Sequence, residues 1–388
     1  MNIPDYHGGS IVNLMHSIIH ARGGYSDVPT LNAVPVDTLA HAKNLILLVI
    51  DGLGAHWLAH HAPHGMLHRA QRTTLTSVFP STTASAITTY LTGAAPLQHG
   101  ITGWFTYLRE LGCVMTILTG KPRYGGISYR QAGVDPVQLF GHTPIFDRIN
   151  TPSVMISPQH IARSDFSLAH AGRAEVIAYD GLTDLFQQTL QVLHRPQLRR
   201  TQRFLCLYWP ALDSIGHAQG MNSAAAVAHL AQIERAIANF LAAAAGTDTL
   251  LLVCADHGQL DTSPAERIEL ADHPELAECL LLPLCGEPRA AFCYVRAGKE
   301  RAFEQYCQQV LGEQVEMIPS WQLVENGLFG FGTPHPHFME RIGDYCLLPR
   351  GQRVIYDRLP SEKPYVQIGV HGGLSAAELM VPLCVFTT

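Results

Sequence analysis

Three short apolar runs along the chain share one pattern, in which nearly every position is hydrophobic and an aspartate follows. Because none of them alternates between apolar and polar residues, each predicts a β-strand that is buried on both faces. The runs are Asn44–Ile50, Phe204–Trp209 and Leu250–Cys254, and the aspartates that follow them are Asp51, Asp213 and Asp256.

Helical periodicity fills the segments between these runs, most clearly from about Ser223 to Ala245, where Gly246 predicts the end of the helix. Strands that alternate with helices predict an α/β fold, with a doubly wound, mostly parallel sheet and helices on both faces. Ligands of such sheets bind beyond the carboxyl ends of the strands. We therefore expect the three aspartates to lie at one edge of the sheet.

The pattern changes after residue 273. Short strand-like pieces, Ala291–Val295 and Tyr345–Leu348, lie on either side of a helical stretch near Glu300–Leu311. We expect residues 1–273 and 365–388 to form the core, and residues 274–364 to form a small α+β lobe inserted into it. The segment Trp104–Phe146 is expected to run over the carboxyl edge of the main sheet and to face the substrate.

Composition narrows the classes of protein and partner. The 388 residues are 47% hydrophobic and 15% charged, with a net charge of -6, which predicts a globular protein without a broad basic face for a nucleic acid polymer or an anionic membrane. No apolar run approaches the ~20 residues of a membrane span, and no signal peptide is recognisable, so we expect a cytoplasmic protein. Nine cysteines without a C-x-x-C pair predict reduced, mostly buried thiols.

A cluster of hydroxyl residues, Ser81, Thr82 and Thr83, opens a probable helix. A hydroxyl at a helix N-terminus is well placed to attack a phosphoryl group, because the free N–H groups and the helix dipole stabilise the anion. It is a poor nucleophile unless a metal or a base lowers its pKa. This segment therefore calls for a metal.

Aspartates and histidines at short spacings could supply that metal site. Asp213 and His217 lie four residues apart, Asp256 and His257 are adjacent, and His371 lies between glycines. Any one of these patterns alone is most often accidental. Together with Asp51 they predict two neighbouring sites with mixed oxygen and nitrogen ligands, the set that Zn²⁺ favours and that Mn²⁺ or Fe²⁺ tolerates.

Other motifs have weaker functional readings. The turn Asp51-Gly-Leu-Gly54 could belong to a dinucleotide-binding motif, but Trp57 stands where its third glycine should fall. Trp104, Tyr107 and Tyr90 could stack on a nucleobase, although aromatic residues near a sheet edge are more often part of the core.

These residues together resemble the alkaline phosphatase superfamily of two-metal hydrolases, and within it the nucleotide pyrophosphatase/phosphodiesterase (type I phosphodiesterase) branch and its phosphonoacetate hydrolase relatives. The resemblance runs from Leu45 to Val381. It implies that one metal is held by Asp213, His217 and His371, and that the other is held by Asp51, Asp256, His257 and the hydroxyl of the nucleophile Thr83. The branch usually has an asparagine three residues after the nucleophile, where this chain has Ala86.

The expected activity is hydrolysis of a phosphodiester or pyrophosphate bond in a small phosphorylated substrate, through a covalent phosphothreonine on Thr83. Two divalent metal ions are the expected cofactors, with zinc favoured and manganese or iron as alternatives. A phosphomonoesterase, a phosphonate hydrolase, a phosphomutase and a catalytically silent metal-binding relative remain open as alternatives. No nucleic acid polymer or membrane is expected as a partner, and the oligomeric state is left open.

Overall fold

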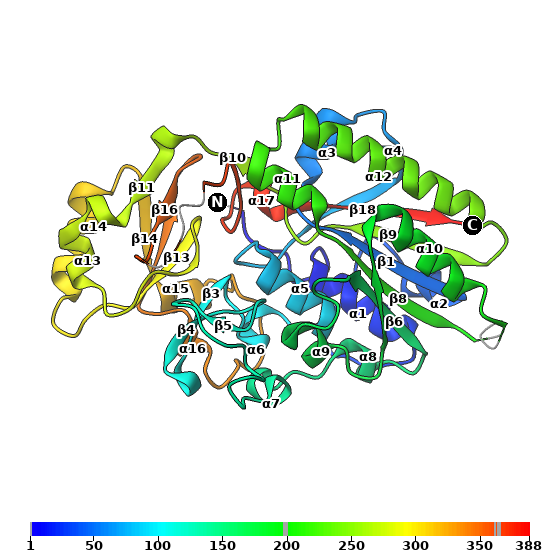
Figure 1. Ribbon diagram of the computed structural model, residues 1–388, viewed down its shortest axis with the longest axis horizontal. Helices are drawn as coiled ribbons and strands as arrows, with labels where there is room; N and C mark the ends of the chain where they lie inside the picture. Colours follow the sequence, from blue (N-terminus) through cyan, green and yellow to red (C-terminus); the bar gives the residue numbers. More distant parts are fainter. Residues whose placement is uncertain (1, 197–200, 361, 363–365) are drawn as a thin grey trace.

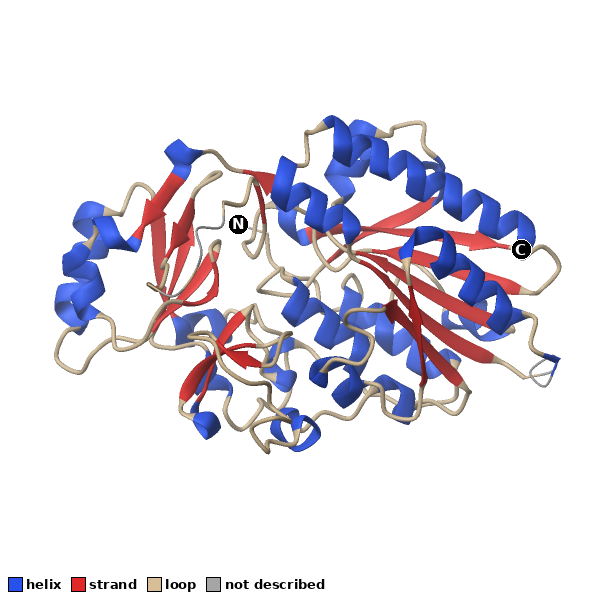
Figure 2. Cartoon of the chain, in the orientation of Figure 1, coloured by secondary structure: helices blue, strands red, loops and turns tan. Residues whose placement is uncertain are grey.

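The computed structural model describes residues 2–196, 201–360, 362 and 366–388, which include two seven-stranded sheets (Figures 1 and 2). The main sheet has the strand order β2-β18-β9-β1-β8-β6-β7. Its strands are β1 (Asn44–Ile50), β2 (Gln71–Thr76), β6 (Ser153–Pro158), β7 (Glu175–Tyr179), β8 (Arg203–Trp209), β9 (Thr249–Cys254) and β18 (Met380–Thr387).

Strand β1 lies at the centre of the main sheet and pairs in parallel with β8 and β9, so that Leu47 lies opposite both Cys206 and Leu252. The strands β6, β7 and β8 continue the parallel arrangement, whereas β18 runs antiparallel to its neighbours β9 and β2. The predicted doubly wound, mostly parallel sheet is therefore confirmed. All seven residues of β1 are buried, as their uninterrupted apolar pattern requires.

Helices cover both faces of the main sheet (Figure 1). One face carries α3, α4, α10, α11 and α12, and the other carries α1, α5, α8 and α9. Their bounds, with those of α2, α6 and α7, are α1 (Ile11–Ala21), α2 (Val36–His41), α3 (Ala55–His61), α4 (Met66–Ala70), α5 (Thr83–Thr92), α6 (Pro96–His99), α7 (Pro136–Phe140), α8 (Ile145–Arg148), α9 (Asp165–His170), α10 (Gly181–Leu193), α11 (Ala211–Gln219) and α12 (Ala224–Ala243).

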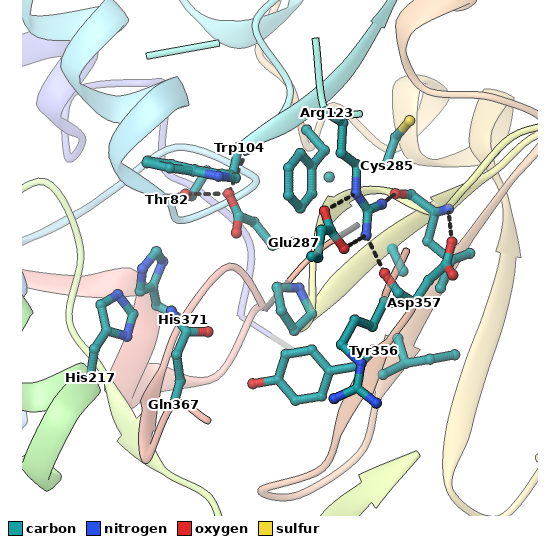
Figure 3. Close-up of a pocket in the computed structure, with 18 of the residues that line it drawn as sticks. Thr82, Trp104, Arg123, His217, Cys285, Glu287, Tyr356, Asp357, Gln367 and His371 are labelled. Carbon is teal, nitrogen blue, oxygen red and sulfur yellow. Dashed lines mark hydrogen bonds and ion pairs between the residues drawn. The ribbon is translucent and has the colours of Figure 1, made fainter. Parts of the chain in front are cut away.

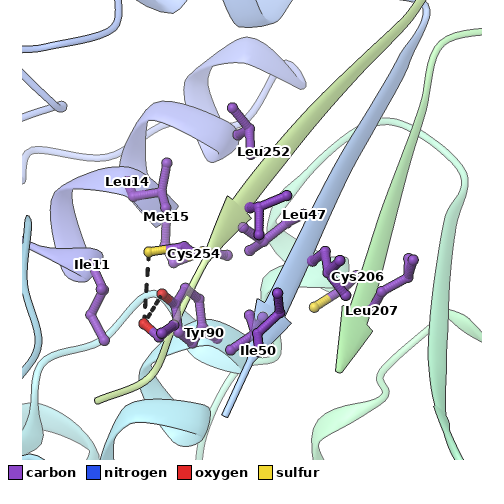
Figure 4. Close-up of a cluster of buried hydrophobic side chains, with 14 of the residues drawn as sticks. Ile11, Leu14, Met15, Leu47, Ile50, Tyr90, Cys206, Leu207, Leu252 and Cys254 are labelled. Carbon is purple, nitrogen blue, oxygen red and sulfur yellow. Dashed lines mark hydrogen bonds between the residues drawn. The ribbon is translucent and has the colours of Figure 1, made fainter. Parts of the chain in front are cut away.

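The main hydrophobic core lies between the sheet and these helices (Figure 4). Leu47 of β1 and Leu252 of β9 belong to the same buried cluster as Leu14 and Met15 of α1, and all four side chains are fully buried. Burial of one such side chain contributes about 1.5–3 kcal/mol. The sheet is therefore a rigid base from which the loops beyond its carboxyl edge project.

The second sheet is antiparallel, with the strand order β14-β15-β13-β12-β3-β4-β5. Four strands and four helices come from the predicted lobe, namely β12 (Cys285–Glu287), β13 (Ala290–Cys293), β14 (Val315–Pro319), β15 (Tyr345–Pro349), α13 (Pro274–Cys279), α14 (Glu300–Val310), α15 (Ser320–Glu325) and α16 (Phe338–Arg341). The other three strands are β3 (Phe105–Leu108), β4 (Cys113–Thr116) and β5 (Lys121–Pro122).

These three strands lie in the segment Trp104–Phe146, which we expected to run over the carboxyl edge of the main sheet. They extend the lobe's sheet, because β3 pairs with β12 through Phe105 and Gly286. The division into a core and a lobe at residues 274 and 364 remains a prediction. Strands from both of these parts belong to the second sheet.

Shorter elements join the two sheets. The strand pairs are β10 (Leu260–Asp261) with β17 (Gly369–Val370) and β11 (Arg267–Glu269) with β16 (Val354–Tyr356), and the short helices are α17 (Ala376–Leu379), η1 (Arg109–Leu111), η3 (Pro264–Glu266) and η4 (Leu270–Asp272). All nine cysteines are free thiols, and eight are buried, as predicted. Within the described ranges, no helix combines the length and apolar character needed to cross a bilayer.

Candidate metal centre

The carboxyl edge of the main sheet brings five of the predicted ligands together. Asp51 follows β1 directly, and the turn after it needs the left-handed conformation of Gly52, whose φ is 77°. Asp256 and His257 follow β9 after Ala255, while Asp213 and His217 lie one turn apart on α11. Parallel neighbours place these chain segments at one edge, as the sequence predicted.

The two remaining residues come from other elements. His371 follows β17, a strand that pairs with β10 just after His257. Thr83 is the first residue of α5, and its Oγ1 lies 3.1 Å from His257 Nε2. The carboxylate and imidazole side chains form two groups, Asp213 with His217 and His371, and Asp51 with Asp256 and His257, each with ligand atoms within 4.8 Å of one another. We call these the outer triad and the inner triad, respectively.

Backbone carbonyls orient the three imidazoles. His217 Nδ1 lies 2.7 Å from Gly369 O, and His257 Nδ1 lies 3.1 Å from Gly258 O. His371 Nδ1 likewise lies 3.2 Å from the carbonyl oxygen of residue 81. Because a carbonyl oxygen only accepts hydrogen bonds, each Nδ1 carries the proton in the neutral ring, and each Nε2 has a free lone pair, the form that binds metals.

These lone pairs face carboxylate oxygens across the centre of each triad. In the inner triad, His257 Nε2 lies 3.3 Å from Asp51 Oδ1 and 3.4 Å from Asp256 Oδ2. Both oxygens are buried and receive no hydrogen bond from any described residue. A buried carboxylate oxygen without a donor is costly, and three facing lone pairs repel one another unless a cation lies between them. The residues therefore fit a divalent metal.

The outer triad has the same arrangement. His217 Nε2 lies 3.3 Å from Asp213 Oδ2, and His371 Nε2 lies 3.8 Å from Asp213 Oδ1. Two nitrogens and carboxylate oxygens form a donor set that zinc favours. The triads adjoin each other, because the rings of His257 and His371 stack with centroids 3.7 Å apart.

Burial and crowding of like charges shift the pKa values of these groups. Burial, with the charges of Asp213 and Asp256, raises the pKa of Asp51 well above its usual range, and burial also raises the pKa of Asp256. Burial alone would raise the pKa of Asp213 as well, but His217 and the neighbouring imidazoles outweigh it, so this pKa is lowered. The raised pKa values show that the inner carboxylates resist ionisation, and a nearby cation would favour their charged forms.

Two residues that the sequence did not single out hold the carboxylates. The hydroxyl of Tyr208 donates to Asp51 Oδ2. The amide of Gln259 donates to Asp213 Oδ1 and, at 3.2 Å, to the carbonyl oxygen of the same residue. Glycines make room for this amide, because a Cβ at Gly216 or Gly369 would lie 2.2 Å from Gln259 Oε1. Only tertiary contacts identify these roles.

A third missed residue, Glu287, lies beside the nucleophile candidate. Its Oε1 accepts hydrogen bonds from Thr82 Oγ1 at 2.6 Å and from the backbone N–H of Trp104 at 2.7 Å. Burial raises the pKa of Glu287 to about 7. No local sequence pattern marks this glutamate, because its partners come from distant segments.

A cavity of about 590 Å³ opens from the outer triad toward the second sheet (Figure 3). Trp104, Glu287, Gln367 and Tyr356 surround it together with His217 and His371 in this view. Thr83 and Asp213 also line it, whereas Asp51, Asp256 and His257 do not. A smaller cavity of about 90 Å³ lies on another side of Thr83.

The structure thus brings all seven predicted site residues together, although their roles as ligands and nucleophile remain proposals. Ala86, where we expected a family asparagine to be replaced, is fully buried in the main core and lines neither cavity. Of the aromatic candidates, Trp104 lines the large cavity, whereas the Tyr90 ring is buried and Tyr107 packs against Tyr294.

Comparison with known protein families finds a match for this chain. Residues 45–314 match the family model described as type I phosphodiesterase / nucleotide pyrophosphatase. None of the curated protein sequences matches the chain.

Several solved structures have a similar fold. Murine ectonucleotide pyrophosphatase/phosphodiesterase 5, as an inactive threonine-to-alanine variant in complex with AMP, has a TM-score of 0.65 and 16% identity over 88% of this chain and 87% of its own. The human protein of that name has a TM-score of 0.65 and 14% identity over 88% and 87% of the two chains. Phosphonoacetate hydrolase from Sinorhizobium meliloti 1021, in complex with phosphonoformate, has a TM-score of 0.64 and 18% identity over 89% and 90%. At these identities the likeness concerns the fold alone.

Proposed function

The chain belongs to the type I phosphodiesterase/nucleotide pyrophosphatase family of the alkaline phosphatase superfamily, and we propose that it hydrolyses phosphodiester or pyrophosphate bonds through a covalent phosphothreonine on Thr83. The observation that carries this proposal is the inner triad, in which Asp51 Oδ1 and Asp256 Oδ2 are buried without a donor and His257 Nε2 lies 3.1 Å from the Thr83 hydroxyl. A hydroxyl there would share the environment that binds the cation.

Divalent cations in the two triads would lower the pKa of the Thr83 hydroxyl and neutralise negative charge on the phosphoryl group. The ligands proposed for them are Asp51, Asp256 and His257 with the Thr83 hydroxyl, and Asp213, His217 and His371. Zinc suits these donors best, and manganese or iron would also fit.

The chain's own groups provide position. The first N–H groups of α5 have no acceptor within the helix and would donate to phosphoryl oxygens beside Thr83. Thr83 Oγ1 would form a bond to phosphorus as the bond to the leaving oxygen breaks, with the leaving group departing on the opposite side. Water would then cleave the phosphothreonine, which releases a phosphomonoester and restores the threonine hydroxyl.

A comparison of three substrates, two chromogenic phosphate esters and one phosphonate, tests the proposal. Zinc-loaded protein should hydrolyse bis-p-nitrophenyl phosphate with a higher kcat/KM than p-nitrophenyl phosphate, and should release no phosphate from phosphonoacetate. A preference for the monoester would favour a phosphatase, and phosphate from phosphonoacetate would favour a phosphonate hydrolase. Inactivity on all three substrates, with metals bound, would favour a catalytically silent relative.

A further inference from the structure

Glu287 lies between Thr82 and Gly372, which are the chain neighbours of the proposed site residues Thr83 and His371. Its Oε1 is held by the hydroxyl of Thr82, next to Thr83, and by the backbone of Trp104. Its Cβ packs against Gly372, the residue after His371, where an added Cβ would lie only 2.6 Å away. The backbone on both sides therefore fixes this carboxylate at the mouth of the site.

The second carboxylate oxygen of Glu287 is available to a ligand. Among the described residues, none donates a hydrogen bond to Oε2, and this atom is absent from the buried unpartnered oxygens, so it touches open space. Glu287 lines the large cavity, and Figure 3 shows its carboxylate on the cavity wall beneath Trp104. A substrate group in this cavity would meet a carboxylate oxygen.

No described cation neutralises Glu287. Within the described ranges it has no ion-pair partner at 4.0 Å or less. Arg123, which also lines the cavity, is paired with Glu362 at 2.8 Å and lies over the ring of Phe105. Of the other two arginines in the cavity lining, Arg267 donates to the carbonyl oxygen of Gln367 at 3.3 Å, and Arg358 is exposed at the rim. The cavity wall beside Thr82 and Trp104 therefore presents the Glu287 carboxylate without a paired cation.

The cavity lies on the side from which a leaving group would depart. Thr83 Oγ1 contacts the inner triad, whereas the cavity is lined by the outer triad and by none of the inner carboxylates. In-line displacement places the leaving oxygen opposite the attacking one. A leaving group that departs past the outer triad would enter the cavity beside Glu287.

We propose that Glu287 is a specificity-determining residue that selects phosphodiesters with an uncharged leaving group over pyrophosphates, an inference that rests on the proposed function. A leaving phosphate would place a second negative charge near the Glu287 carboxylate, and like charges repel. An uncharged leaving group brings no such charge to the cavity. Selection thus comes from repulsion of the charged class.

Two substrates with the same transferred group test this inference. The zinc-loaded wild-type protein should have a kcat/KM for the p-nitrophenyl ester of thymidine 5′-phosphate that exceeds that for thymidine 5′-diphosphate by at least about tenfold. Glu287→Gln keeps the shape and the bond from Thr82 but removes the charge, so it should shrink this ratio by about tenfold, mainly through faster pyrophosphate cleavage. Because each variant is compared on two substrates, the intrinsic reactivity of the leaving groups cancels.

Glu269→Gln is the matched control, because Glu269 lines the same cavity without contacting Thr82 or Trp104. It should leave the ratio unchanged. An equal shift in both variants, no shift in Glu287→Gln, or a wild-type protein that cleaves both substrates equally well would overturn the inference while leaving the hydrolase intact. Should Glu287→Gln fail to fold, Glu287→Ala replaces it, and its ratio should also shrink by about tenfold relative to the wild type. Inactivity of the wild type on both substrates would overturn the proposed function and this inference with it.

Discussion

The imidazole of His371 stacks on that of His257 at a centroid distance of 3.7 Å and an angle of 18° between the planes. His371 belongs to the outer triad and His257 to the inner one. The two triads are therefore in contact through these rings, and replacement of one ring removes a surface on which the other ring packs. Metal binding at the two triads should be coupled through this contact.

Replacement of His371 tests that coupling. His371→Asn removes a ligand atom from the outer triad and the ring that packs on His257, so we expect bound zinc to fall from about two ions per chain to about one, with weaker binding of the ion that remains. Metal analysis after dialysis, combined with zinc titration, measures both effects. The exposed His64 provides a control, and His64→Asn should keep both ions. Full occupancy in His371→Asn would contradict the assignment.

The bond from Gln259 to Asp213 predicts a role for an uncharged residue. Gln259→Met keeps the volume but removes the amide that orients Asp213, so zinc affinity at the outer triad should fall by about 10- to 100-fold. Isothermal titration with zinc gives the affinity directly. Gln232→Met on the surface of α12 should have no effect, and equal affinities in the two variants would show that the amide is dispensable.

Variants of Thr83 distinguish loss of the nucleophile from loss of the metal centre. Thr83→Ala should lower kcat/KM for a phosphodiester by about a thousandfold or more, while leaving the two triads intact. Thr83→Ser keeps a hydroxyl at the same position and should retain much of the activity. Mass spectrometry of the quenched wild-type reaction should find a phosphoryl adduct on the peptide with Thr83. Comparable turnover by the alanine variant would exclude the covalent step.

Zinc should stabilise the folded chain. The unpartnered oxygens of Asp51 and Asp256 destabilise the metal-free fold, and a ligand at a hundred times its Kd contributes about 2.7 kcal/mol. We therefore expect the Tm of chelator-treated protein to rise by roughly 3 °C or more on addition of zinc. The Asp51→Asn, Asp256→Asn double variant should show a clearly smaller rise. If the Tm of the wild-type protein does not change on addition of zinc, the inner triad does not bind the metal.

His170 predicts how stability depends on pH. Burial lowers the pKa of His170 from 6.5 to about 4. Between about pH 6.5 and 4, His170 is therefore protonated in the unfolded chain but neutral in the folded chain. The free energy of unfolding is thus highest above pH 6.5 and falls as the pH decreases through this range.

The loss from this one residue approaches about 3 kcal/mol at the acidic end. Urea unfolding at pH 7.5 and pH 5 measures it. His170→Gln should reduce the difference between the two pH values, whereas His160→Gln at an exposed position should keep it. An unchanged pH dependence in His170→Gln would assign the acid sensitivity to other groups.

The main sheet could be predicted from the sequence because its strands are buried on both faces. Asn44–Ile50 is observed with the predicted bounds, and Leu250–Cys254 is one residue short of β9. The grouping of Asp51, Asp213, His217, Asp256 and His257 could be predicted because these residues follow such strands or lie one helical turn apart. The second sheet could not, because β3 pairs with a strand from far along the chain, and no local pattern encodes that partner.

The same limit applies within the site. Glu287 and Gln259 acquire their roles from contacts with Thr82 and Asp213 that only the folded chain creates. Residue spacing alone likewise does not show which face of α5 meets the core, where Ala86 is buried.

The position of β18 also affects how the protein is made. Strand β2 has no neighbour other than β18 among the described strands of its sheet, and Thr76 pairs with Met380. During translation β2 therefore emerges from the ribosome long before its partner and presents an open edge for most of synthesis. Completion of the main sheet must await β18, so the edge strand β2 can join the sheet only near the end of synthesis.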